Sequence, residues 1–200
     1  MGDKFFPKFN LYDQIGYLLV GSIALIVFIF DLYLLDKRFM FPKLTTSNFI
    51  VWLIIAYFLG HIFQAIANVF IKEDKNNFSD SEKEILNRAK EYFKAEKQSL
   101  HELYSLCYMI SSAKDITGQI QSFNAYYSLY RGWSIIFTLE SSFLLILMVM
   151  NWFNIKNFIL FILSLMITIL FIRRMRRFYN YSRSKTLQTF LILSKNIFQL

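Results

Sequence analysis

Long apolar segments alternate with short polar ones along this chain. Four apolar segments stand out, at residues 15–35, 49–70, 133–153 and 155–172. Each is about 18–22 residues long, which at about 1.5 Å per residue crosses the roughly 30 Å hydrocarbon core of a bilayer. Because hydrocarbon offers no hydrogen-bonding water, the backbone groups of such segments must pair within helices. The pattern predicts an all-α membrane protein with four transmembrane helices.

The polar segments divide the rest of the chain. Ser47 or Asn48 is placed to cap the second span. The region between the second and third spans is long and polar, and the region after the fourth span is basic. We therefore expect five parts: an interfacial N-terminus (1–14), a first transmembrane hairpin (15–70), a cytoplasmic helical insert (71–132), a second hairpin (133–172) and a basic, amphipathic tail helix (173–200).

The insert shows helix signals in three places. Ser79 with Glu82 and Ser99 with Glu102 have the spacing of capping boxes, and a third helical pattern runs up to Gly132. About 60 residues are few for an independent core. We therefore expect the insert to pack on a partner copy or on the tail. The tail has one apolar face that could lie in the membrane interface or pack on the insert: Leu187, Phe190, Leu191, Ile197 and Phe198.

The formal charge of +8 comes almost entirely from the tail. Residues 173–200 hold seven basic residues and no acidic one, whereas residues 71–132 are neutral. A basic cluster directly after a span predicts a cytoplasmic end, so both termini and the insert should be cytoplasmic. The same cluster could contact anionic lipid, and nucleic acid is a weaker candidate. The anchor residues are Arg173, Arg174, Arg176 and Arg177.

Polar residues inside the second span form one helix stripe. Ala56, Gly60, Gln64 and Asn68 recur every four residues, and His61 flanks them. The small residues Ala56 and Gly60 would allow close helix packing. Residues farther along this stripe are polar.

Depth along the spans suggests that polar groups share one layer. Counted at about 1.5 Å per residue from the cytoplasmic ends, six polar residues fall near one another, most of them about 9–13 Å in. A carboxylate facing lipid there would cost on the order of 3 kcal/mol, so Glu140 must face protein or water, or be protonated. The layer could be structural, or it could line a hydrated path within one bundle or around an oligomer axis. Its members are Ser22, His61, Gln64, Asn68, Glu140 and Ser164.

Two further groups lie near the membrane faces. Tyr127, Tyr130 and Arg131 fit an aromatic belt with an arginine at headgroup level. The alternative is a gating joint in which Gly132 transmits movement of the insert to the third span. Asp31, near the outer end of the first span, is expected to pair with Lys37 or Arg38.

Catalytic signals are missing from the sequence. It has no phosphate loop, no GxSxG elbow, no HExxH and no CxxC, and one cysteine, Cys107, excludes an intrachain disulfide. One membrane histidine and one glutamate are too few good ligands for a metal site. We therefore expect no enzyme, no cofactor and no metal.

In size, in its four spans and in its small cytoplasmic helical insert, the chain resembles the small multi-spanning accessory or effector proteins of bacterial antiviral systems, including those encoded beside CRISPR nucleases. The resemblance covers the whole architecture and carries no residue motif. It implies a partner-gated, membrane-perturbing effector. Abundant Phe, Ile, Lys and Asn suggest an AT-rich bacterial genome, and hence the bacterial inner membrane.

Two functions follow as expectations. The first is a homo-oligomeric pore or channel-like effector, gated through the insert, because four spans rarely enclose a conduit alone. The second is a scaffold in which the insert and tail hold a cytoplasmic protein partner and nothing is conducted. A small transporter fits less well, since the spans show no inverted repeat and no broken helix.

Overall fold

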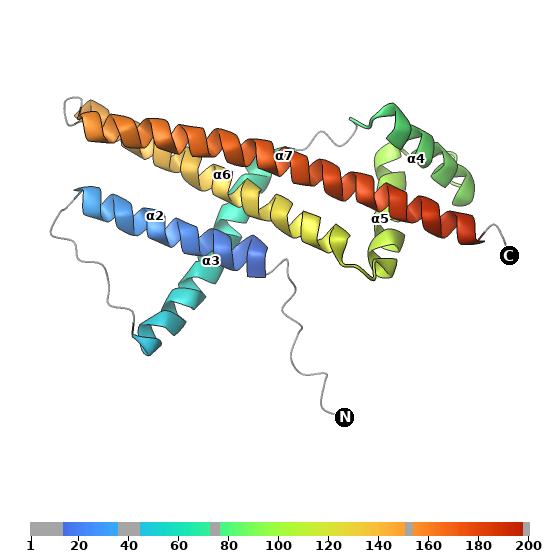
Figure 1. Cartoon of the computed structure of the whole chain (residues 1–200), viewed down its shortest axis with the longest axis horizontal. Helices are drawn as coiled ribbons and strands as arrows, with labels where there is room; N and C mark the ends of the chain where they lie inside the picture. Colours follow the sequence, from blue (N-terminus) through green and yellow to red (C-terminus); the bar gives the residue numbers. More distant parts are fainter. Residues whose placement is uncertain (1–13, 36–44, 73–76, 151–153, 198–200) are drawn as a thin grey trace. The chain divides into compact units, whose positions relative to one another are not determined.

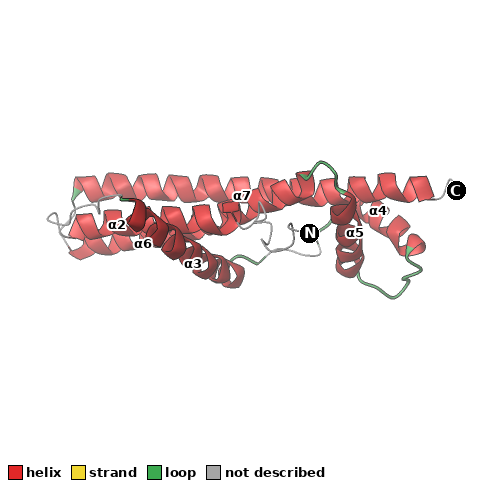
Figure 2. Ribbon diagram, turned by 90° about the horizontal axis from the view of Figure 1, so that it is seen from below, coloured by secondary structure: helices red, strands yellow, loops and turns green. Residues whose placement is uncertain are grey.

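The computed structural model describes residues 14–35, 45–72, 77–150 and 154–197. This described part is helical and contains no strand (Figure 2). Its elements in chain order (Figure 1) are η1 (Gln14–Leu19, a π-helix), α2 (Val20–Leu35), α3 (Thr46–Phe70), α4 (Asp80–Tyr92), α5 (Leu100–Lys114), α6 (Gln119–Met150) and α7 (Ile155–Ile197).

Four helical stretches are long and apolar enough to cross a membrane: Ile15–Leu35, Thr46–Phe70, Gln119–Met150 and Ile155–Ser194. This confirms the prediction of an all-helical protein with four candidate spans. Residues 1–13 of the predicted interfacial N-terminus lie outside the described residues. So do Lys37 and Arg38, the residues expected to pair with Asp31.

Two helices are longer than the sequence pattern suggested. The third insert helix and the third span form one helix, α6, and the fourth span and the tail form one helix, α7. Residues 173–178 contain neither Gly nor Pro, so nothing there interrupts a helix. Gly132 lies inside α6, where a glycine costs about 1 kcal/mol relative to alanine but does not break the helix.

The chain folds into two compact units. The first, here called the spanning unit, comprises Met1–Ile71 and Ala125–Arg177. The second, here called the helical module, comprises Lys72–Asn124 and Phe178–Leu200. Both α6 and α7 contribute residues to each unit.

In the spanning unit, η1 and α2 pack tightly on α3. A Cβ atom on Gly21 would overlap the carbonyl oxygen of Ala56, and one on Gly60 would overlap that of Tyr17. Ala56 is fully buried at this contact. Because residue numbers rise on one helix as they fall on the other, the two helices run antiparallel. Small side chains bring the backbones together, as is common between membrane helices.

Small hydroxyl side chains line the contact between α6 and α7. Ser141 Oγ donates to Ser164 Oγ at 3.0 Å, and Ser164 Oγ in turn contacts the carbonyl oxygen of Phe137 at 3.0 Å. Nearer the other end of this contact, Phe171 packs against the rings of Tyr130 and Trp133.

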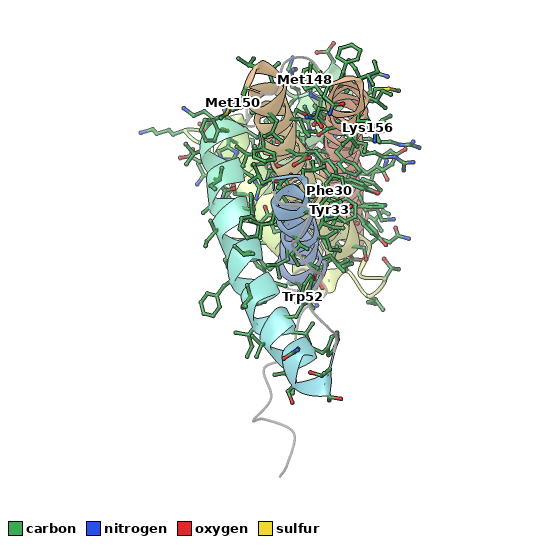
Figure 3. The ribbon with its side chains drawn as sticks, turned by 90° about the vertical axis from the view of Figure 1, so that its left-hand side faces the viewer. Phe30, Tyr33, Trp52, Met148, Met150 and Lys156 are labelled. Atoms are coloured by element: carbon green, nitrogen blue, oxygen red, sulfur yellow. The ribbon has the colours of Figure 1, made fainter. Side chains whose placement is uncertain are left out.

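The end of α6 at Met150 and the start of α7 at Ile155 lie at one end of the spanning unit. Figure 3 looks onto this end and labels Met148, Met150 and Lys156. Phe30 and Tyr33, from the last turns of α2, are labelled in the same view.

The helical module has its own apolar core. Leu86 and Ala89 of α4 and Leu103 of α5 are fully buried, and Leu187 and Phe190 of α7 complete the cluster. Leu187 and Phe190 belong to the apolar face predicted for the tail. In the structure these two residues pack on α4 and α5, whereas the side chains of Ile197 and Phe198 lie outside the described residues.

A buried ion pair ties the tail to the insert within the module. Arg183 binds the Glu82 carboxylate through two hydrogen bonds of 2.8 Å, and it donates a third, also of 2.8 Å, to the carbonyl oxygen of Asn77. Both charged side chains are nearly buried, at 10% and 12% exposure. A bidentate pair with a further hydrogen bond to the backbone holds one fixed geometry.

The observed helix N-caps match the sequence-based predictions in the module, but not at the start of α3. Both predicted capping boxes form, from Ser79 to Glu82 and from Ser99 to Glu102. The prediction that Ser47 or Asn48 caps the second span is wrong. Thr45 is the N-cap and accepts a hydrogen bond from the Asn48 backbone, so the helix begins earlier than expected.

Replacing Gly60 by leucine tests the close contact between α2 and α3. Because the side chain would meet the backbone of Tyr17, Gly60→Leu should lower the free energy of unfolding by about 1–3 kcal/mol. Val51→Leu is the control, since Val51 is 53% exposed on the same helix. Unfolding of the full chain in mixed micelles measures both, and equal stability of the two variants would contradict this packing.

The thiol of Cys107 reports on the core of the module. Cys107 is fully buried, and burial raises the pKa of its thiol to about 12. Because thiolate is the reactive form, maleimide at pH 8 should label native Cys107 very slowly and the unfolded chain quickly. Ser105 is exposed, so Ser105→Cys in a Cys107→Ser background is a fast-reacting reference. Labelling of native Cys107 at the reference rate would show that this core is open.

Candidate functional site

A buried carboxamide joins three segments of the spanning unit. Gln64 is 3% exposed, and its Nε2 donates to the carbonyl oxygens of Gly16 at 2.9 Å and Ser128 at 2.7 Å. Its Oε1 accepts from Nη2 of Arg131 at 2.9 Å and from Nε of Arg131 at 3.3 Å. A carboxamide has two donors and two acceptor positions, so Gln64 has no capacity left.

Arg131 is buried beside Gln64. It is 8% exposed, its guanidinium lies 5.1 Å from the centre of the Tyr127 ring, and it donates to the Tyr127 hydroxyl at 3.4 Å. The expectation of an arginine reaching a lipid headgroup is therefore replaced by a contact inside the protein. The π-helix η1 supplies the Gly16 carbonyl group, and π-helical turns are frequent at functional sites.

Gly132 has a packing role in this structure. A Cβ atom there would lie 2.6 Å from Val20 Cγ1 and 3.0 Å from Gln64 Nε2. The missing side chain therefore lets α6 approach α2 and the Gln64 carboxamide. Tyr130, from the same predicted group, packs edge to face on Trp133 and at a tilt on Phe171.

The contacts of Gln64 set the register of the helices. They place Gly16 and Ser128 at one level, and Arg131 at the level of Gln64. Residues of α6 before residue 133 therefore already belong to the spanning unit, which resumes at Ala125. From that common level Asp31 lies about 22 Å along η1 and α2, and Glu140 about 18 Å along α6.

This register brings the two acidic residues of the spans together. The Asp31 and Glu140 side chains are within hydrogen-bonding reach of each other. Glu140 is 7% exposed, and within the described residues Asp31 Oδ1 and Glu140 Oε2 are buried without a hydrogen-bond partner. Two carboxyl groups can share a hydrogen bond when one of them holds a proton.

The six residues expected in one polar layer fall into separate places. Gln64 lies with Arg131, Glu140 lies with Asp31, and Ser164 lies in the contact between α6 and α7. Ser22 is half-buried on α2. The structure therefore does not bring Glu140 to Gln64 or to His61.

His61 and Asn68 lie on the outer side of α3. Both are exposed, as is Ala65 between them, whereas Gln64 and Ala67 are buried. The His61 ring stacks on Tyr17, with ring centres 3.8 Å apart, and meets the edge of Tyr57 at 4.6 Å. One face of a predicted span thus carries polar groups away from its own bundle.

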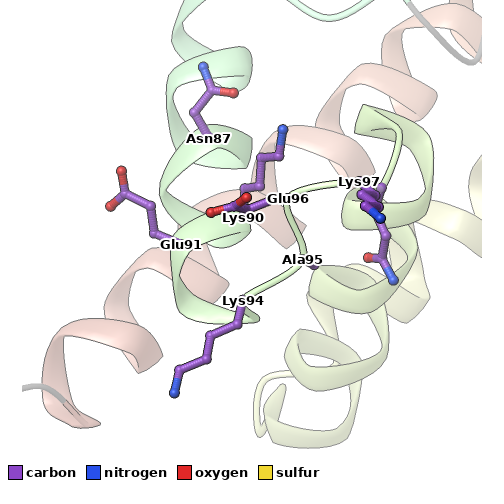
Figure 4. Close-up of a pocket in the computed structure, with 8 residues that line it drawn as sticks. Asn87, Lys90, Glu91, Lys94, Ala95, Glu96 and Lys97 are labelled. Carbon is purple, nitrogen blue, oxygen red and sulfur yellow. The ribbon is translucent and has the colours of Figure 1, made fainter.

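The helical module has a shallow pocket of about 1110 Å³ at the turn between α4 and α5. Figure 4 shows Glu91 and Lys94 pointing away from this turn, with Lys90, Glu96 and Lys97 also on its lining. Lysines and glutamates alternate there, so the lining selects neither anions nor cations. We therefore place the candidate functional residues in the spanning unit.

Removing the Gln64 carboxamide tests the joint between the three segments. Gln64→Leu would leave two buried carbonyl groups and Arg131 without their partner, so the free energy of unfolding should fall by on the order of 2 kcal/mol. Ile66→Leu, a change of equal volume two residues further along α3, is the control. Unfolding in mixed micelles measures both, and an unchanged stability of Gln64→Leu would exclude this role.

Comparisons of the chain with models of protein families, with curated proteins and with solved structures find no match. The function must therefore be argued from the geometry of the chain itself.

Proposed function

We propose that this chain forms an oligomeric, channel-like pore in a membrane and that its subunits meet along the polar face of α3. The observation that carries the proposal is the exposure of His61, Ala65 and Asn68 on a helix long and apolar enough to span a bilayer. These residues are spaced four and three apart, so they share one helix face.

Lipid is a poor environment for this face. His61 lies about 13 Å from the end of α3 at Phe70, which is well inside the hydrocarbon of a spanning helix. Its ring planes are covered by Tyr17 and Tyr57, but its nitrogens have no hydrogen bond within the described residues. A polar group in hydrocarbon costs several kcal/mol unless it finds a partner or water. A second copy, or water between copies, would supply that partner.

The interior of a single subunit is a weaker candidate for the path. Gln64 uses all its hydrogen-bonding positions within the subunit, and Ser164 is buried in the contact between α6 and α7. These groups act as internal packing contacts. A conduction path that runs between subunits does not require these contacts to break.

The module is the proposed controlling element. Each of α6 and α7 belongs partly to the spanning unit and partly to the module, so a change in the module would reach the spans through two continuous helices. A role in bacterial defence, a place in the inner membrane and cytoplasmic termini belong to the same proposal. Their support is the architectural resemblance and the basic residues after the fourth span.

A scaffold without conduction is the second candidate. The observation that favours it is the exposure of large apolar side chains on the module, with Met109 at 66%, Ile116 at 100% and Ile192 at 60%. Such residues could hold a cytoplasmic protein partner. A scaffold needs the spans for position alone, so it predicts that the α3 face tolerates substitution.

Cross-linking through α3 tests the proposed assembly. His61→Cys in a Cys107→Ser background should form a disulfide-linked dimer in membranes under mild oxidation, because the same face of two copies would be in contact. Ile62→Cys in that background is the control, since Ile62 is 53% exposed about 100° around the same helix. Equal cross-linking at the two positions would show random collision.

Ion release from liposomes then separates the two functions. In the pore, His61→Leu and Asn68→Leu should change the rate of release relative to wild type, whereas Ile62→Leu should not. Cross-linking at position 61, together with no ion release from liposomes that carry wild type or any variant, would support the scaffold.

A further inference from the structure

Four arginines lie on one side of α7 directly after its apolar run. Arg173, Arg174, Arg176 and Arg177 are exposed, and Met175 between them is 7% exposed. At about 100° per residue the four arginines fan over an arc of about 160°, and Met175 points to the opposite side. We call Arg173, Arg174 and Arg176 the arginine collar.

In the described part of the chain, no acidic side chain forms an ion pair with the collar. The sequence holds no acidic residue after Glu140. Arg183 on the same helix shows the contrast, because it is paired with Glu82. The charge of the collar is therefore available to a ligand outside the chain.

Two features place the collar at the level of lipid phosphates. It begins directly after Ile172, the last residue of the apolar run. Two residues before it, Phe171 packs with Tyr130 and Trp133, and aromatic clusters of this kind mark the membrane interface. A guanidinium group at that depth can bind a phosphodiester through two parallel hydrogen bonds.

The surface below the collar is apolar on the same side of α7. Met166, Ile169 and Leu170 are 58%, 52% and 56% exposed. By helical rotation they lie within the arc of the collar. On one face of α7, the cationic collar matches the anionic headgroup of a diacyl lipid, and the adjoining apolar residues match its acyl chains. Inorganic phosphate or nucleic acid would use the collar alone.

We propose that the arginine collar and the apolar strip beneath it form a binding site for anionic phospholipids. Each basic residue near a membrane surface contributes about fivefold to the association with anionic lipid. Loss of three arginines should then reduce the selective retention of such lipid by roughly tenfold or more. The site is independent of the pore proposed above, because it lies on α7 and requires no second copy.

Lipid retention by the full chain tests the site. Wild type is placed in nanodiscs with phosphatidylcholine and phosphatidylglycerol in equal proportion in both leaflets, and the lipids that remain on the released protein are identified by mass spectrometry. Phosphatidylglycerol should be enriched on wild type. The triple variant Arg173→Gln, Arg174→Gln and Arg176→Gln should retain both lipids near their bulk ratio. Because the leaflets are identical, a role as topology anchor alone would not change this readout.

A control variant distinguishes the effect of losing the arginines at the collar from the effect of lowering the net charge of the protein. Lys94→Gln, Lys97→Gln and Lys114→Gln remove the same three charges from exposed positions of the module and should leave the enrichment unchanged. The matching lysine variant of Arg173, Arg174 and Arg176 should keep part of it and shows that the site still folds. Bulk-ratio lipid on wild type, or full enrichment on the glutamine variant, would overturn the proposal.

Competition with soluble anions tests whether the ligand of the collar is a lipid and not a phosphate or a nucleic acid. Glycerol 3-phosphate and a short single-stranded DNA should not displace phosphatidylglycerol from wild type, because neither has acyl chains for the apolar strip. Displacement by glycerol 3-phosphate would reduce the site to a phosphate site, and displacement by DNA alone would assign the collar to nucleic acid.

Discussion

The Gln64 carboxamide holds α3, α6 and the start of the first span at one level, and much of the spanning unit depends on this constraint. Its two carbonyl partners come from chain segments far apart in sequence, and Arg131 occupies its oxygen. In hydrocarbon no water can replace these bonds, so a shift of one helix by a single turn would leave several buried groups unsatisfied. The glycines at positions 21, 60 and 132 let the backbones come close enough for these bonds to form.

Much of the fold could be predicted from the sequence because its signals are local. Apolar length identifies a span, and a Ser-x-x-Glu spacing identifies a capped helix start, as at Ser79 and Ser99. The apolar period of the tail likewise identified Leu187 and Phe190 as residues that need a packing partner. Each of these signals lies within about a dozen residues.

The candidate site depended on register, which is not local. Counting depth from the start of an apolar run placed Glu140 with Gln64, whereas α6 enters the spanning unit about eight residues earlier. The sequence still held a usable signal, since Asp31 and Glu140 are the two acidic residues of the four predicted spans and neither can face lipid cheaply. Pairing them requires parallel first and third spans, which a four-span topology already implies. The outward position of His61 gave no comparable signal, because a stripe of small and polar residues fits an inner face equally well.

The helical module draws its core from two distant parts of the chain, and this has a consequence for synthesis. Leu86, Ala89 and Leu103 are made well before Leu187 and Phe190, which complete the same cluster. Glu82 likewise precedes Arg183, its partner, by about a hundred residues. Domains otherwise tend to fold as units while the chain is being made. Here the core of the module cannot be completed until synthesis has passed both candidate spans of α6 and α7 and reached Phe190.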